Sequence, residues 1–334
     1  MGTSLRVVGG TPTLDHPVVV VGAGISGLAC ARALRDGGVP VQVLDRGRAV
    51  GGRLASRTLG GRRVDLGASY FTVSDERFEA VVADWIARGV ARAWTSTFHK
   101  ADPRGLGETT TGPVRYVGTT GQRGLAEDLA RGLDVVTADD VEYVALGGDP
   151  EARPAPFVVL AMPDPQACDL LDDTLTEVRE TVEGREWLPT LALAVGFAER
   201  TWNPALDGAF VGDSAVLAWV ADDGRRRGDG APVLVAHTAA EFAAPRLDAP
   251  QAARDDILAA TVGLLGIPAD PEWTHVHRWS LSAPAAGREA RFHLGEQGVG
   301  LCGDGWGPNA KVETAWLSGH LLGSALVARL SQQR

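Results

Sequence analysis

Apolar residues near the start of the chain form a continuous run and then a helical stripe. Val18 to Val21 make an unbroken β-branched run, which is typical of a buried parallel strand. A helical pattern follows from Ile25 to Asp36 and ends at a glycine pair, and a second strand is expected over Val39 to Leu44. This strand, helix and strand predict an α/β fold with a parallel sheet.

The pattern then becomes less regular before apolar strands return. Ser74 or Asp75 is expected to cap a helix whose apolar stripe ends at Gly89. Residues 92–113 show no clean period and predict a loop-rich cover. Further elements are expected as a helix over 125–133, strands over 135–136, 141–146 and 157–161, and a final helix over 315–330. The final helix has a face of small residues every four positions, which suits close packing on a sheet.

Residues 164–291 have a different pattern. Short β-prone runs are separated by turn clusters and by one helix over about 251–265. The runs are 190–197, 216–220, 233–238 and 273–279. This part predicts an α+β region built on an antiparallel sheet with helices on one face.

A glycine motif lies between the first strand and the first helix. Gly22, Gly24 and Gly27 have the GxGxxG spacing, with Ile25 and Ser26 opening the helix. The first glycine permits a tight turn, the second allows a pyrophosphate to approach, and the third brings helix and strand together. Asp45, about twenty residues further on, can accept the hydroxyls of an adenosine ribose. These features predict a Rossmann-type dinucleotide site for either NAD or FAD.

The residues after Asp45 favour FAD. Arg46 and the run Gly51-Gly52-Arg53 follow directly, and together they resemble the signature of the flavin-containing amine oxidase superfamily. The resemblance implies that Gly52 and Arg53 contact the pyrophosphate and ribityl chain of FAD. A guanidinium would offset phosphate charge that one helix terminus offsets only in part. For Arg53 alone, a solvated loop arginine is the alternative.

Other segments carry the same resemblance. It implies that Gly67 and Ala68 lie beside the isoalloxazine ring, that the strand containing Val136 meets the adenine, and that Asp304, after Gly303, holds a ribityl hydroxyl. Val312 begins the helix expected near the flavin N1 and O2. Cys302 is either a covalent flavin link or plain core; core is the more common use of such a cysteine, so non-covalent FAD is expected.

The resemblance also implies a discontinuous domain organisation. An FAD-binding domain is expected over 17–66, 114–163 and 292–334, and a substrate domain over 67–113 and 164–291. Residues 1–16 are expected to form a flexible extension. The substrate region has no second GxGxxG motif, so no separate NAD(P)H-binding Rossmann unit is expected.

Segments of the substrate region resemble bacterial renalases more narrowly. These are LAWVADDGRRRG (217–228), VLVAHTAAEF (233–242) and HRWSLSAPA (277–285). Renalases are FAD oxidases that return 2- and 6-dihydro-NAD(P) to NAD(P)+ and pass the electrons to O2, so H2O2 formation is implied. Amine oxidases usually hold a lysine from the substrate domain near flavin N5, whereas the only lysines of this chain are Lys100 and Lys311, and none lies between them.

Candidate substrate residues come from the same strands. His237 and Arg278 could orient a polar substrate, and Trp219 and Trp279 could form aromatic walls or ordinary core. A dihydropyridine loses hydride to form an aromatic cation, so no general base is required. The alternatives are an FAD-dependent amine oxidase or dehydrogenase acting on a biosynthetic small molecule, and a flavoprotein whose main role is binding.

Composition narrows the partners further. The chain has 334 residues, 45% of them hydrophobic, with a net charge of −10, which argues against nucleic acid. The final helix is too polar to predict a membrane span, and the three scattered cysteines suit a reducing, cytoplasmic location. The His275 and His277 pair lacks a third ligand, so no metal is expected. Arg225 to Arg227 predict a solvated loop, and no pattern specifies an oligomeric state.

Overall fold

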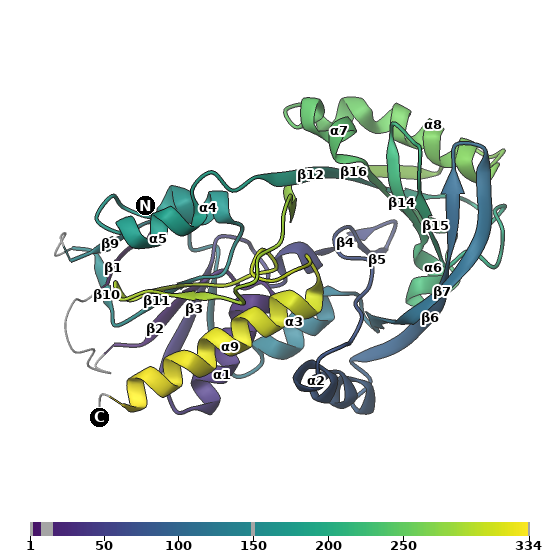
Figure 1. Ribbon diagram of the computed structural model, residues 1–334. Helices are drawn as coiled ribbons and strands as arrows, with labels where there is room; N and C mark the ends of the chain where they lie inside the picture. Colours follow the sequence, from purple (N-terminus) through teal and green to yellow (C-terminus); the bar gives the residue numbers. More distant parts are fainter. Residues whose placement is uncertain (1–2, 8–15, 148–150, 333–334) are drawn as a thin grey trace. The chain divides into compact units, whose positions relative to one another are not determined.

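The computed structural model describes residues 3–7, 16–147 and 151–332, and their contacts divide the chain into two compact units (Figure 1). Unit 1 comprises Met1–Arg53, Leu125–Trp187 and Ala283–Arg334. Unit 2 comprises Leu54–Gly124 and Leu188–Ser282. Each unit therefore combines segments that lie far apart in the sequence.

Unit 1 is built on a six-stranded sheet in the order β17-β18-β11-β2-β3-β8. Its strands are β2 (Val18–Val21), β3 (Val41–Asp45), β8 (Asp134–Thr137), β11 (Val158–Leu160), β17 (His293–Leu294) and β18 (Val299–Leu301). Only the β17–β18 pair is antiparallel. Because β3 and β11 pair with opposite sides of β2, the carboxyl end of β2 is a topological switch point, where sheets of this class bind ligands. The predicted Rossmann-type α/β fold is confirmed.

Helices α1 (Ile25–Asp36) and α9 (Val312–Ser331) pack against each other in unit 1 (Figure 1). A Cβ atom at Gly319 would lie 1.8 Å from the carbonyl oxygen of Ser26, and one at Gly323 would lie 2.6 Å from that of Cys30. The small face of α9 therefore packs on a helix and not on a sheet, because glycine lets the two backbones approach. Helix α3 (Arg123–Ala130) leads into β8.

The amino-terminal residues form part of the core of unit 1. Strand β1 (Thr3–Val7) lies in a parallel three-stranded sheet between β9 (Val141–Leu146) and β10 (Arg153–Ala155). Leu5 and Val7 are buried against this core, to which α4 (Asp164–Leu170) and α5 (Thr176–Val182) also contribute. The expected flexible extension over 1–16 is thus wrong for residues 3–7, since alternate apolar side chains enter the core; residues 8–15 lie outside the described part.

Unit 2 contains a seven-stranded sheet in the order β16-β12-β15-β14-β13-β6-β7. Its strands are β6 (Ala91–Asp102), β7 (Gly105–Gly118), β12 (Trp187–Gly196), β13 (Gly208–Val211), β14 (Leu217–Asp222), β15 (Val233–Thr238) and β16 (Trp273–Pro284). The pairs β12–β15, β14–β15, β13–β14 and β6–β7 are antiparallel, as predicted, whereas β13 and β6 are parallel. A separate hairpin joins β4 (Ser56–Leu59) and β5 (Arg62–Asp65).

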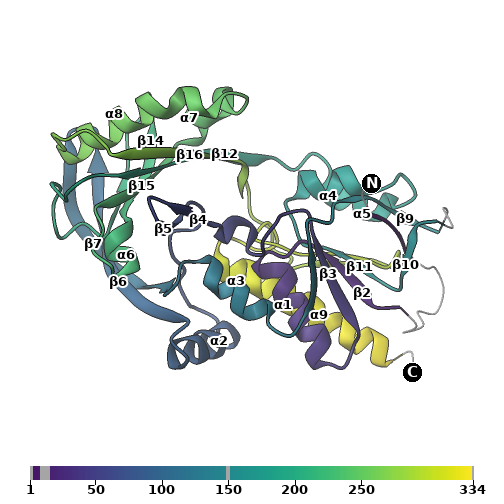
Figure 2. The same cartoon turned by 180° about the vertical axis from the view of Figure 1, so that it is seen from behind.

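The two faces of this sheet have different partners. Leu193 and Leu234 pack with Ile257 of α8 (Arg254–Leu265), and Figure 2 shows α7 (Ala240–Ala243) and α8 together over the sheet. On the opposite face, Ala194 and Val235 pack with Leu66, next to the β4–β5 hairpin. The remaining helical elements are α2 (Glu76–Ala87), α6 (Asp223–Arg227), η1 (Gly52–Leu54), η2 (Ala244–Arg246) and η3 (Pro250–Ala253).

Unit 2 shows which residue caps α2 and what structure residues 92–113 adopt. The Asp75 side chain caps α2 by accepting a hydrogen bond from the Arg77 backbone N–H at 3.0 Å, so Asp75 and not Ser74 is the cap. The loop-rich cover expected over 92–113 is wrong, because these residues form the long hairpin of β6 and β7. Register shifts along this hairpin break the alternation of apolar and polar positions, which hid it in the sequence pattern.

The compact units do not coincide with the expected domain boundaries. Residues 54–66 and 114–124 belong to unit 2, whereas 164–187 and 283–291 belong to unit 1. The hairpin β4–β5 contributes Val64 to the core of unit 2, and α4 and α5 contribute Ala167 and Val178 to the core of unit 1. Side-chain packing of these segments, which a motif does not report, sets the boundaries.

Candidate functional site

The glycine turn of unit 1 has the geometry that its spacing predicts. Gly22 has a φ of +110°, and a Cβ there would lie 2.6 Å from the Ala161 carbonyl oxygen. A Cβ at Gly27 would lie 2.0 Å from the carbonyl oxygen of Gly22. Nothing lies within 4 Å of a Cβ at Gly24, which precedes α1 and provides no side-chain cap. The turn is therefore tight at both ends and open in the middle, at a helix N-terminus that favours anions.

Asp45 lies at the end of β3, next to this turn. Its Oδ2 accepts a hydrogen bond from the Ala23 backbone N–H at 2.5 Å, and its Oδ1 accepts one from Gly47 at 2.7 Å. The carboxylate thus holds the turn in shape, an interaction that the sequence did not indicate. A carboxylate has about four lone-pair sites, so acceptor capacity is left for further donors.

The glycine pair lies against the same turn. The Gly51 N–H donates to the Ala23 carbonyl oxygen at 2.9 Å, and Gly51 forms a bridge with Gly24. A Cβ at Gly52 would lie 3.5 Å from the Cα of Gly24, and its φ of +50° favours glycine. The two glycine-rich segments therefore form one backbone surface.

Arg53 and Asp304 bind each other, although they are 251 positions apart. The guanidinium makes two hydrogen bonds of 2.7 Å, one to each carboxylate oxygen, and lies 5.0 Å from the centre of the Trp187 ring. Their side chains are 29% and 13% exposed, respectively, so the pair is partly shielded from water. The alternative of a solvated loop arginine is excluded.

The segment around Asp304 is anchored to α9. The Gly303 N–H donates to the Ser318 hydroxyl at 3.0 Å, and Val312 is the buried first residue of α9. Burial raises the pKa of the neighbouring Cys302 to about 12, so its thiol stays protonated at neutral pH. Cys302 is therefore core and a poor nucleophile.

The remaining predicted cofactor residues of unit 1 differ in exposure. Ile25 and Ser26 are buried in the first turn of α1, whereas Arg46 is exposed just after β3. Val136 is exposed on β8, the edge strand of the parallel sheet. The structure brings the glycines, Asp45, Arg53 and Asp304 into unit 1; Gly67 and Ala68 belong to unit 2.

In unit 2, the turn containing Gly67 and Ala68 is held by three of the predicted substrate residues. The Trp279 indole donates to the Leu66 carbonyl oxygen at 2.8 Å, and the Trp219 indole donates to the Ser69 hydroxyl at 3.0 Å. His237 also forms a hydrogen bond with the backbone of Leu66. Trp219, Trp279 and His237 therefore support one short turn from neighbouring strands.

His237 is uncharged at neutral pH. Burial, and then the charge of Arg226, lower its pKa to about 4, although the hydrogen bond with Leu66 opposes the shift. Its Nε2 is buried without a hydrogen-bond partner among the described residues. His237 can thus offer this nitrogen to a ligand without placing a positive charge there.

Arg278 does not join this group. Its neighbour Trp279 faces the Leu66 turn, but Arg278 donates to the Leu247 carbonyl oxygen at 2.7 Å and is exposed. Successive side chains of a strand point to opposite faces, so the two cannot share a site on one face. Arg278 therefore lies on the face of β16 opposite to Trp279.

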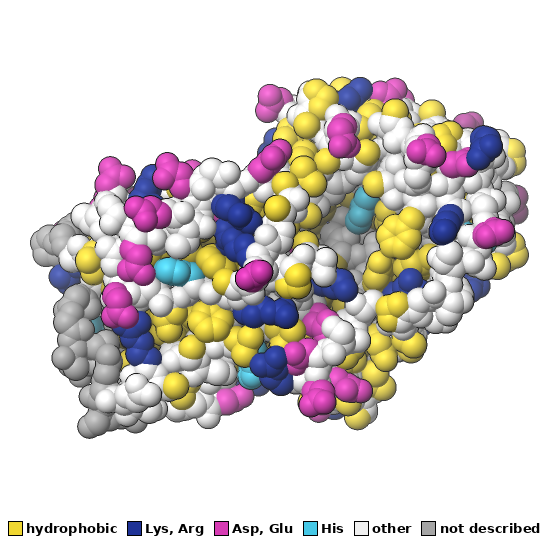
Figure 3. Space-filling view, in the orientation of Figure 1, with side chains coloured by type: hydrophobic (Ala, Val, Ile, Leu, Met, Phe, Trp, Pro, Cys, Tyr) yellow, Lys and Arg dark blue, Asp and Glu magenta, His cyan; other side chains and the backbone are white. Residues whose placement is uncertain are grey.

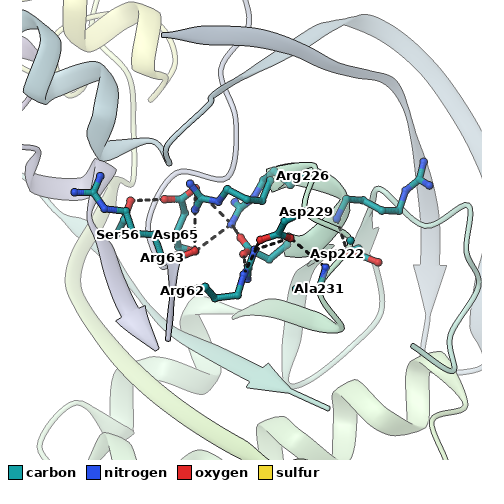
Figure 4. Close-up of polar contacts among 12 residues, drawn as sticks. Ser56, Arg62, Arg63, Asp65, Asp222, Arg226, Asp229 and Ala231 are labelled. Carbon is teal, nitrogen blue, oxygen red and sulfur yellow. Dashed lines mark hydrogen bonds and ion pairs between the residues drawn. The ribbon is translucent and has the colours of Figure 1, made fainter. Parts of the chain in front are cut away.

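Arg226, the middle residue of the run at 225–227, belongs to a buried ionic cluster and not to the solvated loop that was expected, whereas Arg225 is exposed (Figure 4). Arg226 is 1% exposed, pairs with Asp223, and donates to the carbonyl oxygens of Ser69 at 3.1 Å and Asp65 at 3.3 Å. Burial alone would raise the pKa of Asp223, but the Arg226 and Arg62 charges hold it below its ordinary value. In the sequence, three consecutive arginines flanked by aspartates look the same whether they are buried or exposed, so the sequence did not reveal this cluster.

His275 and His277 are neighbouring histidines on β16. Burial, and then the charge of Arg57, lower the pKa of His277 to about 4, and its ring centre lies 6.4 Å from that of His275. Among the residues placed by the structure, no group of three metal-ligating side chains occurs. Within that same part of the chain, no helix is long and apolar enough to cross a membrane.

Known proteins are similar to this chain in one sequence segment and in overall fold. Residues 20–85 match the family of NAD(P)-binding Rossmann-like domains. Among solved structures, putrescine oxidase bound to putrescine has a TM-score of 0.70 at 15% identity and covers 98% of this chain and 100% of that one. Cyclohexylamine oxidase from Brevibacterium oxydans IH-35A has a TM-score of 0.73 at 14% identity, covering 95% and 100%. The chain therefore has the overall fold of these oxidases.

Two relatives are similar to this chain in sequence over shorter segments. Putrescine oxidase from Kocuria rosea is 36% identical over 80 residues, which are 24% of this chain and 17% of that protein. The neurosporene-forming phytoene desaturase from Rhodobacter capsulatus is 51% identical over 57 residues, 17% of this chain and 11% of that protein. The matches thus span less than a fifth of those relatives, all named as oxidases or desaturases.

Proposed function

We propose that this protein is an FAD-dependent oxidoreductase with non-covalently bound FAD, and that it acts as an oxidase. The observation that carries the proposal is the single surface formed by Gly24, Gly51 and Gly52, followed at once by the Arg53–Asp304 pair. Bound FAD would accept a hydride from the substrate and pass its electrons to O2. The names and folds of the similar oxidases support this class.

The residues of unit 1 fit such a cofactor. The open position at Gly24 and the uncapped start of α1 would receive the pyrophosphate, with Arg53 offsetting its charge. Asp45 has acceptor capacity left for the ribose, while Val136 would border the adenine. Gly303, Asp304 and Val312 would contact the ribityl chain and the flavin. The high pKa of Cys302 supports a non-covalent cofactor.

For the substrate, we infer a renalase-like oxidation of 2- or 6-dihydro-NAD(P) to NAD(P)+ with H2O2 formation. Hydride loss from a dihydropyridine requires no proton acceptor. His237, beside the Gly67–Ala68 turn, is uncharged at neutral pH and would not repel the cationic product. Unit 2 has one lysine, Lys100, which is exposed. Within this reading, Gly67 and Ala68 would border the flavin ring, and Trp219, Trp279 and His237 would hold them there.

An FAD-dependent amine oxidase or dehydrogenase is the second candidate. It is favoured by a cluster of aromatic side chains in unit 2, in which the ring centres of Tyr70 and Trp219 are 5.8 Å apart. Aromatic faces attract organic cations. The two candidates are separated by the reductant that the flavin accepts.

The first test concerns the cofactor. The purified protein should be yellow, and acid precipitation should release one FAD per chain into the supernatant. Cys302→Ser should release the same amount. Colour that stays in the pellet of the parent protein, but not of the variant, would contradict non-covalent binding.

The second test concerns the substrate. Under anaerobic conditions, 2- or 6-dihydro isomers made by borohydride reduction of NAD+ should bleach the flavin band, and air should restore it with formation of H2O2. Ordinary 4-dihydro NADH should act at least about a hundredfold more slowly, because a misplacement of about 1 Å can cost that factor. If a primary or secondary amine bleaches the flavin and neither isomer does, the amine oxidase reading replaces this one.

A further inference from the structure

Arg115 of β7 is a buried cation without a counterion. It is 8% exposed, and its Nε and Nη1 have no hydrogen-bond partner within the described part of the chain. No ion pair of Arg115 is found there either. Leaving a charged group unpaired in the interior is costly, so the position of Arg115 requires an explanation, and an acceptor supplied by a ligand is one.

The Arg115 guanidinium lies over an aromatic ring that belongs to a larger group of aromatic side chains. Its Cζ lies 4.2 Å from the centre of the Phe98 ring, a distance at which a cation is attracted to the ring face. Phe98 in turn lies 5.2 Å from Tyr70 and 5.3 Å from Trp94, measured between ring centres. We call Tyr70, Trp94, Phe98, Trp219 and Phe210 the aromatic cluster; Trp219 and Phe210 are each within 5.7 Å of Phe98.

The cluster holds a second unsatisfied donor. The Trp94 Nε1 is buried without a hydrogen-bond partner among the described residues. Indole and guanidinium groups can only donate, so both need an acceptor. Burial raises the pKa of Tyr70 by more than the charge of Arg115 lowers it. The phenol therefore stays protonated at neutral pH and adds no negative charge.

The cluster remains reachable from solvent. Phe210 is 49% exposed at its edge, and Tyr70 and Trp94 are each partly exposed. Figure 3 shows hydrophobic and basic side chains side by side over the part of unit 2 in which β6 and β7 run. Part of the aromatic cluster therefore lies at the surface of unit 2.

We propose that the aromatic cluster is a binding site for a ligand with a planar group and an anionic group, with Arg115 recognising the anion. The anion is a carboxylate or a phosphate, because both accept paired hydrogen bonds from a guanidinium fork. The aromatic rings pack against the planar group, and the Trp94 indole donates to the same acceptor or to a neighbouring one. Arg115 is a specificity residue that selects anions and rejects cations.

That this ligand is the substrate rests on the proposed function. A nicotinamide nucleotide carries both a planar ring and a phosphate, whereas a simple amine carries the same sign of charge as Arg115. The site therefore favours phosphorylated dihydronicotinamides over amines, although aromatic rings alone would accept either.

Binding is tested on the oxidised holoprotein by isothermal titration calorimetry with four matched probes. Benzoate and phenyl phosphate carry the anion, benzamide is the neutral analogue of benzoate, and benzylammonium is the cation. We expect at least one anion to bind about tenfold more tightly than benzamide, and benzylammonium to bind more weakly than benzamide. The preferred anion distinguishes a carboxylate ligand from a phosphate ligand.

Two variants assign the effect to Arg115. Arg115→Gln should reduce anion affinity to the level of benzamide and leave benzamide unchanged; Arg115→Lys, which keeps the charge but loses the fork, should fall between. Arg104→Gln is the matched control, because Arg104 lies in the turn of the same hairpin, is 90% exposed and pairs with Asp102. Circular dichroism melts check folding. The proposal is overturned if wild-type protein binds anions no better than benzamide, or if Arg115→Gln leaves anion affinity unchanged.

The link to the substrate has its own readout. In the flavin bleaching assay, Arg115→Gln should raise the KM for the dihydro forms of nicotinamide mononucleotide about tenfold and leave that for the riboside unchanged. An equal change for both would refute the link. If no dihydronicotinamide bleaches wild-type protein, the proposed function fails, while calorimetry still decides the anion site.

Discussion

The bidentate pair between Arg53 and Asp304 allows a quantitative prediction about cofactor affinity. If both side chains contact FAD as one unit, either single alanine substitution also removes the support of the other. Hydrogen bonds to charged groups contribute about 1.5–3 kcal/mol, which is about 10- to 150-fold in Kd. Because the Arg53 and Asp304 side chains are 29% and 13% exposed, water would solvate part of the remaining charge, so we expect the lower half of that range.

The double variant decides whether the two residues act together. Arg53→Ala combined with Asp304→Ala should weaken FAD binding little more than the worse single variant, because each single change already breaks the pair. Arg53→Lys should lose most of the effect as well, since an ammonium cannot donate in the same fork.

The assay is titration of apoprotein with FAD, followed by quenching of flavin fluorescence. Arg35→Ala serves as control, because Arg35 forms an exposed pair with Asp36 in the same unit. Losses that simply add in the double variant would show that Arg53 and Asp304 contact the cofactor independently. Full FAD affinity in Asp304→Ala would remove this pair from the cofactor site.

Three further predictions concern stability and pH. Arg226→Met should lower the free energy of unfolding by about 3–5 kcal/mol in urea, because it removes one of the two arginines that pair with the buried Asp223 and the donor to two buried carbonyl oxygens; Arg225→Ala, a more exposed neighbour, should cost under about 1 kcal/mol. Gly319→Ala should destabilise the protein by about 1–3 kcal/mol or more, since its Cβ would lie 1.8 Å from a backbone oxygen; the same urea titration would disprove close α1–α9 packing if stability were unchanged. The folded-state pKa of His237, about 4, lies below the ordinary 6.5, so the unfolded chain binds more protons between these values and stability should fall as pH drops through that window. His237→Gln should flatten that part of the pH profile relative to wild type, and an identical profile would contradict a buried neutral histidine.

Local patterns in the sequence determined the nucleotide-type core of unit 1. Helix α1 runs over the predicted residues, and β9 and β15 also match their predicted bounds. The glycines of the turn were identifiable because each answers a local backbone requirement: a positive φ at Gly22 and a contact at Gly27 that leaves no room for a Cβ. Such requirements depend on near neighbours in the chain, so spacing alone reveals them.

Features that depend on irregular strands were not visible in the same way. The β6–β7 hairpin has register shifts that disrupt its alternation, and β1 is short and separated by more than a hundred residues from β9, its partner. A strand of this kind acquires its stability from pairing, which no local window contains. The sequence pattern therefore underestimated the amount of sheet.

The identity of the candidate residues came from motifs, but their partners came only from the tertiary structure. Arg53 and Asp304 were each singled out, yet their mutual pairing joins positions 251 apart. Arg226 and Arg115 carry no local signal that separates a buried arginine from a surface one, because burial depends on which distant strands and turns pack around it. The sequence by itself thus determined the backbone chemistry of the glycine turn, and the tertiary structure decided which charges are buried and which are paired.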